Sequence, residues 1–169
     1  MSTHTETMSS AAAGSRRIHR SLIARVPLYL GALGVLATGI VHIQQFYGQD
    51  YSTIPTIGTL FFLNFVAAVV LTAGLIAPLG RVAGRHADAV RAAFAVGGVG
   101  FAVLSLVALF VSEGSGLFGF QENGYRMAIV LAIVAEAAAV VFLAVFLAAD
   151  GVADLRRTRD RVKQPPEGR

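Results

Sequence analysis

The stretch that decides the fold is "MAIVLAIVAEAAAVVFLAVFLAA", residues 127–149, an apolar run interrupted by one acidic residue, Glu136. A helix needs about 20 mainly apolar residues to cross the hydrocarbon core of a bilayer, and this run has that length. Alanine, leucine and valine dominate it, without the alternation of polar and apolar residues that is typical of a membrane β-barrel. We therefore expect residues 127–149 to form a membrane-spanning helix.

Three further apolar stretches precede this one, at residues 26–46, 57–79 and 92–111. The chain of 169 residues is 55% hydrophobic and only 14% charged, whereas a soluble domain has about 25% charged residues. The sequence therefore predicts an all-α fold, a four-helix transmembrane bundle (residues 26–149) with up-down-up-down topology. A disordered, basic N-terminal segment is expected over residues 1–25 and a charged tail over residues 150–169.

The basic residues predict the orientation of this bundle. All but one of the 14 lysines and arginines precede the first span, separate the second from the third, or follow the fourth, and the exception is Arg126. Cytoplasmic connections are enriched in lysine and arginine, so both termini are expected in the cytoplasm. This distribution accounts for the net charge of +4 without nucleic acid as a partner. The expected partner is the lipid bilayer, and the expected location is a cell membrane that the chain crosses several times.

Three expectations concern the ends of the spans. Pro27 is expected in the first turn of the first span, where its missing backbone donor costs little. The connection at residues 116–120, "GLFGF", is expected either to pack in the headgroup region or to fold over the outer mouth of the bundle as a lid. The helix of the fourth span is expected to continue through residues 150–163.

Polar side chains within the apolar stretches mark a candidate site. The segment "GIVHIQQFYGQDYSTIPTIGTLFFLN", residues 39–64, carries His42 and Gln45 near the end of the first span and Asn64 within the second. An ionised side chain at the centre of a transmembrane helix costs roughly 2.5–3.5 kcal/mol. We therefore expect Glu136, in the fourth span, to face the interior of the bundle rather than lipid.

Depth and direction bring these side chains together. At about 1.5 Å of rise per residue, Glu136 lies about 14 Å below the outer end of its span, Asn64 about 10 Å and His42 about 6 Å. Side chains lean toward the N-terminus of their helix, so His42 points down into the membrane and the other two point up. The sequence therefore predicts a polar cluster of His42, Gln45, Asn64 and Glu136 in the outer half of the bilayer, with Ser105 as a contributor from the third span.

Two interpretations of this cluster are open. In the first, its role is structural, and its hydrogen bonds fix the register of the helices. In the second, it is an outward-facing site for a small polar ligand, a proton or a metal ion. Glu136 would then be the proton acceptor or anionic contact, with His42 as the titrating partner or ligand.

Other chemistries lack the residues that they need. The chain has no cysteine, which excludes disulfides, iron–sulfur clusters and thiol catalysis. Haem held by two histidines needs a second imidazole in the membrane, but His4, His19 and His86 are expected in the cytoplasm. One histidine and one glutamate are too few for a structural zinc site. No nucleophile elbow, phosphate loop or metalloprotease helix occurs in the sequence.

We therefore expect no cofactor, no metal and no enzymatic activity. The function that the sequence favours is a non-enzymatic accessory or ligand-binding subunit of the membrane. The alternative is a small oligomeric transporter linked to protons or to a metal ion, because an intramembrane carboxylate can support proton coupling. Both a membrane protein complex and a homo-oligomer are open as further partners.

Several of these segments together resemble a known family. Residues 39–64, "GLFGFQE" at 116–122 and "EAAAVV" at 136–141 are similar to the uncharacterised four-span integral membrane proteins of high-GC Gram-positive bacteria. The resemblance covers about residues 28–148. It rests on a histidine near the end of the first span, on "IPTIG" opening the second, on "GLFGF" before the fourth and on the glutamate within it. It implies a four-span bundle in a bacterial cell membrane and implies no particular activity.

Overall fold

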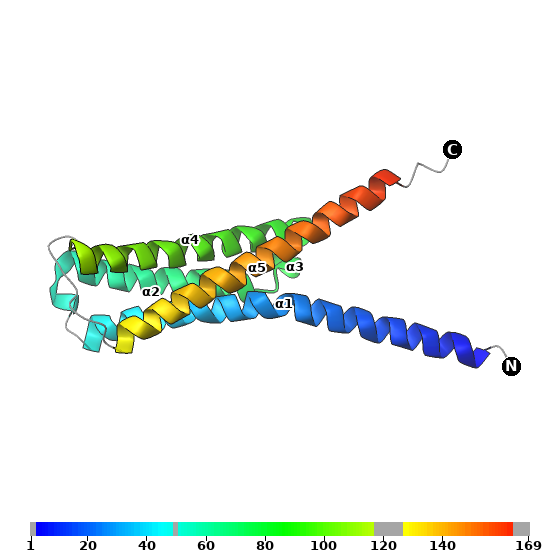
Figure 1. Cartoon of the computed structure of the whole chain (residues 1–169), viewed down its shortest axis with the longest axis horizontal. Coiled ribbons are helices and arrows are strands. Elements are labelled where there is room, and N and C mark those ends of the chain that lie inside the picture. Colours follow the sequence, from blue (N-terminus) through cyan, green and yellow to red (C-terminus); the bar gives the residue numbers. More distant parts are fainter. Residues whose placement is uncertain (1–2, 49–50, 117–126, 164–169) are drawn as a thin grey trace.

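The computed structural model describes residues 3–48, 51–116 and 127–163, and the regular elements of these residues are all helices. Four long helices form one bundle (Figure 1). The long helices are α1 (Thr3–Gly48), α2 (Pro55–Ile76), α4 (Ala87–Gly114) and α5 (Met127–Lys163), and the short ones are η1 (Tyr51–Thr53), α3 (Leu79–Val82) and η2 (Gly84–His86). The prediction of an all-α four-helix bundle is confirmed.

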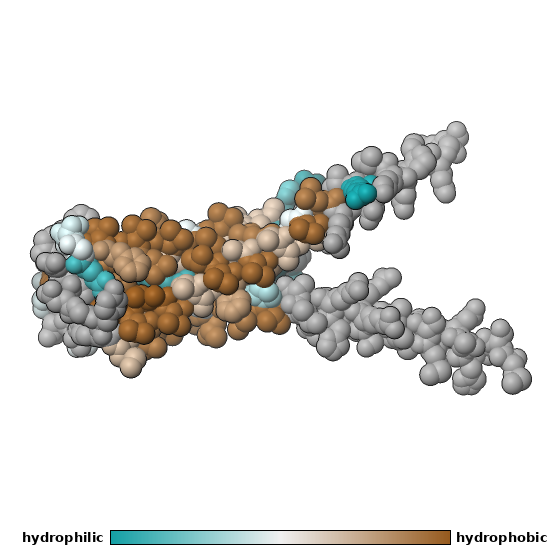
Figure 2. Space-filling view, viewed as in Figure 1, coloured by the Kyte–Doolittle hydropathy of each residue, from teal (hydrophilic) through white to brown (hydrophobic). Residues whose placement is uncertain are grey.

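Each long helix carries a segment that is long and apolar enough to cross a membrane. These segments are Arg25–Gly48, Thr56–Ile76, Gly84–Gly114 and Met127–Ala153. Apolar residues cover most of the coloured bundle surface in Figure 2, and many large apolar side chains on it are exposed. Monomeric soluble proteins rarely expose so much contiguous apolar surface. The chain is therefore a multi-pass membrane protein.

The helices run alternately up and down, and both ends of the chain project from the same end of the bundle (Figure 1). α1 packs against α2 and α5, and α4 packs against the same two helices. The order around the bundle is therefore α1, α2, α4, α5. The charge distribution predicts that the end with the two termini faces the cytoplasm.

Two helices extend further than the sequence suggests. α1 begins at Thr3, so it runs through most of the segment for which we expect disorder, and Pro27 lies inside the helix rather than in its first turn. A low content of apolar residues argues against a packed core but not against a helix, because each residue added to an existing helix gains one hydrogen bond. α4 covers residues 87–114 and so exceeds the expected span of 92–111 at both ends.

The other two expectations about span ends have different outcomes. α5 continues to Lys163, as the sequence predicts. Of the expected lid at residues 116–120, only Gly116 lies within the described residues. Gly116 follows α4 with a φ of 80°, in the left-handed region that glycine adopts readily, so it ends the helical direction of α4.

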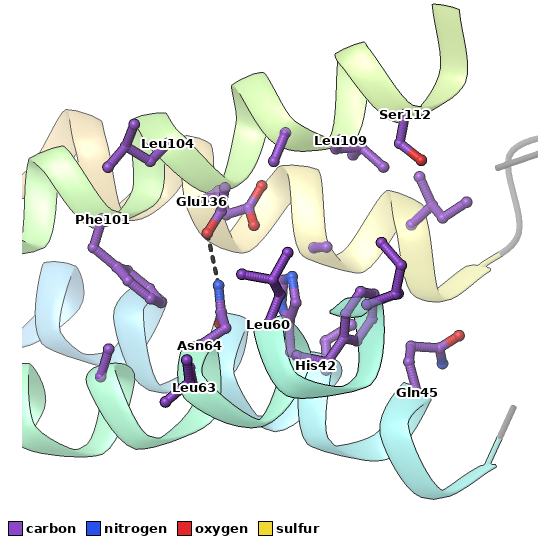
Figure 3. Close-up of a pocket in the computed structure, with 18 of the residues that line it drawn as sticks. His42, Gln45, Leu60, Leu63, Asn64, Phe101, Leu104, Leu109, Ser112 and Glu136 are labelled. Carbon is purple, nitrogen blue, oxygen red and sulfur yellow. Dashed lines mark hydrogen bonds between the residues drawn. The ribbon is translucent and has the colours of Figure 1, made fainter. Parts of the chain in front are cut away.

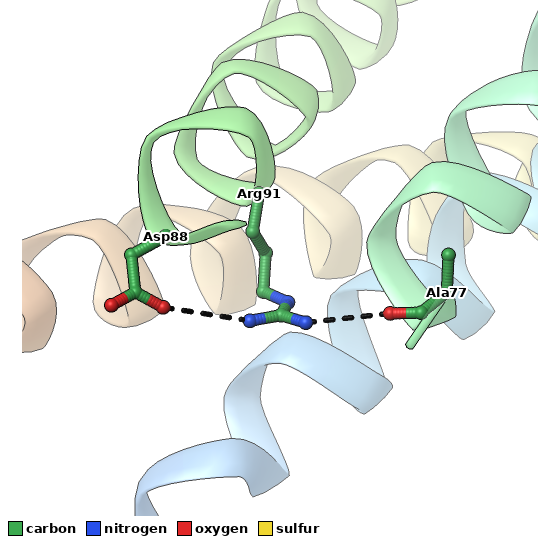
Figure 4. A network of polar contacts seen from close by, with 3 residues as sticks. All are labelled: Ala77, Asp88 and Arg91. Atoms are coloured by element: carbon green, nitrogen blue, oxygen red, sulfur yellow. Dashed lines mark hydrogen bonds and ion pairs between the residues drawn. The ribbon is translucent and has the colours of Figure 1, made fainter. Parts of the chain in front are cut away.

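The connection between α2 and α4 is held by Arg91 (Figure 4). α2 ends before Pro78, since the residue that precedes a proline is disfavoured in the helical conformation. The Arg91 Nη2 atom donates a hydrogen bond of 3.3 Å to the carbonyl oxygen of Ala77, and Nη1 lies 3.8 Å from the Asp88 carboxylate. A cation at a helix C-terminus also interacts favourably with the helix dipole. Arg91 thus ties the start of α4 to the end of α2.

The buried core occupies the half of the bundle nearer the termini. Its residues come from all four long helices, and Val35, Leu75 and Leu143 are the largest completely buried apolar side chains among them. Without a hydrophobic driving force between helices in lipid, such packing depends on close backbone approach at small residues. The core members are Leu28, Ala32, Val35, Ala68, Leu75, Ala95, Ala102, Ala139, Leu143 and Phe146.

The closest approach of α1 and α5 is made possible by Gly34. A Cβ atom on Gly34 would lie 2.8 Å from the carbonyl oxygen of Ala135 and 2.9 Å from the backbone nitrogen of Ala139. These are backbone atoms, so they cannot move aside as the end of a flexible side chain could. The backbones of α1 and α5 are therefore in direct contact at this level, and this contact turns the face of α5 that carries Ala135 and Ala139 toward α1.

We expect Gly34→Ala to lower the free energy of unfolding by about 1–3 kcal/mol, the usual cost of overpacking a tight interface. Thermal unfolding followed by circular dichroism in detergent measures the change. The matched control is Gly100→Ala in α4, because a Cβ atom there meets nothing within 4 Å. Equal stability of the Gly34→Ala variant and the parent would contradict the assigned α1–α5 contact.

Candidate functional site

The half of the bundle away from the termini contains a cavity of about 380 Å³ between all four long helices (Figure 3). Its walls are mostly apolar and carry a few polar side chains. Ligand pockets typically measure about 300–1,000 Å³ and have this composition, so the cavity has the size for a small ligand. α4 contributes one helical face to it, with residues spaced by three or four positions: Phe101, Leu104, Ser105, Ala108, Leu109 and Ser112.

The structure places all four residues of the predicted polar cluster on the wall of this cavity. His42 and Gln45 come from α1, Asn64 from α2 and Glu136 from α5. In Figure 3, Glu136 and Asn64 project into the space between the helices, while Gln45 lies further toward the end with the loops. Within residues 3–48, 51–116 and 127–163, no hydrogen bond joins these four side chains to one another. They share one cavity but do not form one hydrogen-bond network.

Glu136 is the most deeply buried polar side chain of the cavity wall. Its exposed fraction is 1%, and its Oε2 atom has no hydrogen-bond partner. The periodicity of α5 explains the burial, because Ala132 and Ala139 lie on the same face and are buried with it. A buried polar atom without a partner destabilises the folded protein, since it has lost its hydrogen bonds to water. The bundle therefore holds Glu136 at a cost in stability.

Asn64 connects α2 to α4. Its Nδ2 atom donates a hydrogen bond of 2.8 Å to the Oγ atom of Ser105, which is the dashed line in Figure 3. Its Oδ1 atom is buried and has no partner. The donor side of the amide is thus partly used by the fold, whereas the acceptor side is left for another group.

His42 is oriented by its own helix. The Nδ1 atom lies 2.9 Å from the carbonyl oxygen of Thr38, one turn earlier in α1. A carbonyl oxygen only accepts hydrogen bonds, so Nδ1 carries the proton of this contact, and Nε2 of the neutral ring is an acceptor. The ring also packs against Phe61 of α2, with 4.9 Å between ring centroids. The imidazole therefore has a defined orientation and one remaining acceptor atom.

Ser112 is a cavity residue that the sequence analysis does not identify. Its exposed fraction is 7%, and its Oγ atom has no hydrogen-bond partner. The expected third span ends at residue 111, which places Ser112 in a connection rather than in the bundle. Its spacing of seven residues from Ser105 indicates the same helical face, and this signal could have identified it.

The described residues include no group of three or more histidine, cysteine, aspartate or glutamate side chains that could hold a metal ion. No protein-family model, curated protein or solved structure matches the chain. The fold and the cavity define a multi-pass membrane protein with a mostly apolar intramembrane cavity and hydrogen-bond acceptors on its wall. The functional argument therefore depends on the geometry of this cavity.

We expect Glu136→Met to raise the free energy of unfolding by about 1–3 kcal/mol, because the substitution removes a buried polar group that lacks a partner. The contrasting variant is Ser105→Ala, which removes a hydrogen bond between helices and should lower stability by about 0.6 kcal/mol. Circular dichroism in detergent, with thermal or denaturant unfolding, gives both values. A Glu136→Met variant less stable than the parent would assign Glu136 a structural role.

Proposed function

We propose that the chain is a non-enzymatic, ligand-binding subunit of a cell membrane, and that its ligand occupies the cavity between the four long helices. The observation that carries this proposal is the carboxyl group of Glu136, which lines the cavity, is 1% exposed and has an oxygen without a partner. A ligand that contacts Glu136 would supply the missing interaction. The orientation predicted from the basic residues puts the cavity in the outer half of the bilayer.

The structural interpretation of the polar cluster has less support. A polar network that stabilises a membrane bundle is expected to satisfy its members, because each unsatisfied group destabilises the fold. Here buried oxygen atoms of Asn64, Ser112 and Glu136 lack partners. Only the Asn64–Ser105 hydrogen bond links two helices among the polar side chains of the cavity wall.

The packing of the other half favours binding over transport. Beyond Glu136, toward the termini, Val35, Leu75 and Leu143 are completely buried in the core. A transported ion or proton would have to pass this packed layer to reach the other side of the membrane. A metal-linked transporter would also need more ligands than one carboxylate and one imidazole. The described cavity therefore fits a ligand that enters and leaves on one side.

The ligand-binding role predicts that small amphiphiles stabilise the protein. We expect at least one of octylamine, octanol and octanoate to raise the unfolding temperature in nanodiscs, since a ligand at about 100 times its Kd adds about 2.7 kcal/mol of stability. Ala132→Leu should abolish this effect, because Ala132 lines the cavity and is buried.

The control for this experiment is Ala137→Leu, which adds the same side chain at an exposed position of α5. We expect the Ala137→Leu variant to respond to the amphiphiles as the parent does. The proposal fails if none of the three compounds stabilises the parent more than the Ala132→Leu variant.

The transport alternative has its own test in sealed liposomes that contain a pH-sensitive dye. We expect proton flux through the reconstituted protein to equal that of empty liposomes, because the core near the termini is closed by packed side chains. Proton flux that is present in the parent and lost in Glu136→Gln would favour the transporter over the binding subunit.

A further inference from the structure

The cavity opens sideways, toward the hydrocarbon that surrounds the bundle. Three of its lining residues are also substantially exposed on the outer surface: Leu60 by 41%, Leu63 by 53% and Leu104 by 69%. Leu60 and Leu63 belong to α2 and Leu104 to α4, and Figure 3 places Leu63 and Leu104 on opposite sides of the cavity. In a membrane-spanning bundle such side chains face the acyl chains of the lipids. The mouth of the cavity between α2 and α4 therefore admits molecules that dissolve in the bilayer.

The polar wall of the cavity presents hydrogen-bond acceptors rather than donors. The Nδ2 atom of Asn64 already donates to Ser105, and the Nδ1 atom of His42 already donates to the Thr38 carbonyl. The free Oδ1 atom of Asn64 and the free Oε2 atom of Glu136 are acceptors, as is Nε2 of the neutral His42 ring. A ligand that complements this wall must itself donate hydrogen bonds.

The charge of the wall indicates which donor fits. None of the described residues that line the cavity is lysine or arginine. An ionised Glu136 therefore has no cationic partner on the described wall, and an unpaired carboxylate is unfavourable in a medium of low dielectric constant. A ligand with an ammonium group supplies both the positive charge and the N–H donors. Hydrogen bonds of this kind, between two charged groups, are roughly twice as strong as neutral ones.

We propose that the ligand is an amphiphilic ammonium compound, a protonated primary or secondary amine on an apolar chain, which enters from the bilayer between α2 and α4. This inference rests on the proposed ligand-binding role and names its ligand class. The ammonium group contacts Glu136 and Asn64, and the chain lies along the leucine side chains toward the mouth. With a volume of about 380 Å³, the cavity takes one short chain or part of a longer one.

Equilibrium dialysis against protein in phosphatidylcholine nanodiscs tests the ligand class with three probes of equal chain length. The probes are octylamine, octanol and octyltrimethylammonium, and binding to the Ala132→Leu variant is subtracted as partition into lipid. We expect octylamine to bind at least about tenfold more tightly than octanol, a difference of about 1.4 kcal/mol that one charge-assisted contact can supply. The quaternary compound should bind more weakly than octylamine, because it has no N–H donor.

The Glu136→Gln variant should bring the affinities for octylamine and octanol to within about threefold of each other, since the amide keeps the shape of the side chain but not its charge. Circular dichroism checks that this variant is folded, and Glu136→Met, expected to be more stable than the parent, gives the same comparison if it is not. Equal binding of octylamine and octanol by the parent overturns the ammonium assignment and leaves the binding role intact. The absence of saturable binding by all probes overturns both.

The lateral entrance is tested by the rate of octylamine association. We expect Leu104→Trp to slow association by at least about threefold, because the larger side chain narrows the mouth, whereas Val96→Trp, at a similarly exposed position of α4, should not. Equal rates for the two variants overturn the entrance between α2 and α4.

Nanodiscs with added phosphatidylethanolamine distinguish the two sources of an ammonium group. A weaker apparent octylamine affinity in these nanodiscs assigns the ammonium group to a lipid headgroup. An unchanged affinity assigns it to a free amine.

Discussion

The contact between α1 and α5 at Gly34 is the constraint on which the rest of the bundle depends. The backbone of α1 lies against the backbone of α5 at Ala135 and Ala139, where a single added carbon would clash. In lipid, helices gain little from burying apolar surface, so close packing of this kind largely determines how they associate. The contact fixes the rotation of α5 about its axis. Glu136, between the two alanines in sequence, is thereby buried inside the bundle instead of facing lipid.

The two halves of the bundle serve different purposes because of this arrangement. In the half near the termini, small residues and interlocked apolar side chains fill the interior. In the other half, the four helices enclose a cavity and present polar atoms to it that lack partners. The packed half supplies stability, and the hollow half uses part of it to hold a carboxyl group in an apolar environment. Destabilising groups of this kind typically occur where a protein binds a ligand or moves a proton.

Much of this organisation could be predicted from the sequence, but the ends of the helices could not. Hydropathy identifies four spans because each needs about 20 apolar residues, whatever the neighbouring helices do. It does not identify where a helix stops, since α1 and α5 continue well beyond their apolar parts. The same limit explains why Ser112 was missed: α4 extends past residue 111 and carries this serine into the bundle. Boundaries depend on local backbone preferences, such as Gly116 and Pro78, more than on hydropathy.

The sequence by itself determined the class of fold, the number of spans and the inward direction of Glu136, because apolar length and helical periodicity are properties of each segment alone. Only the tertiary structure decided that Asn64 donates to Ser105, that His42 is held by Thr38 and Phe61, and that a cavity opens between α2 and α4. These features depend on the separation and rotation of neighbouring helices to within about an ångström. That precision comes from the packing of side chains between helices, which no single segment of the sequence contains.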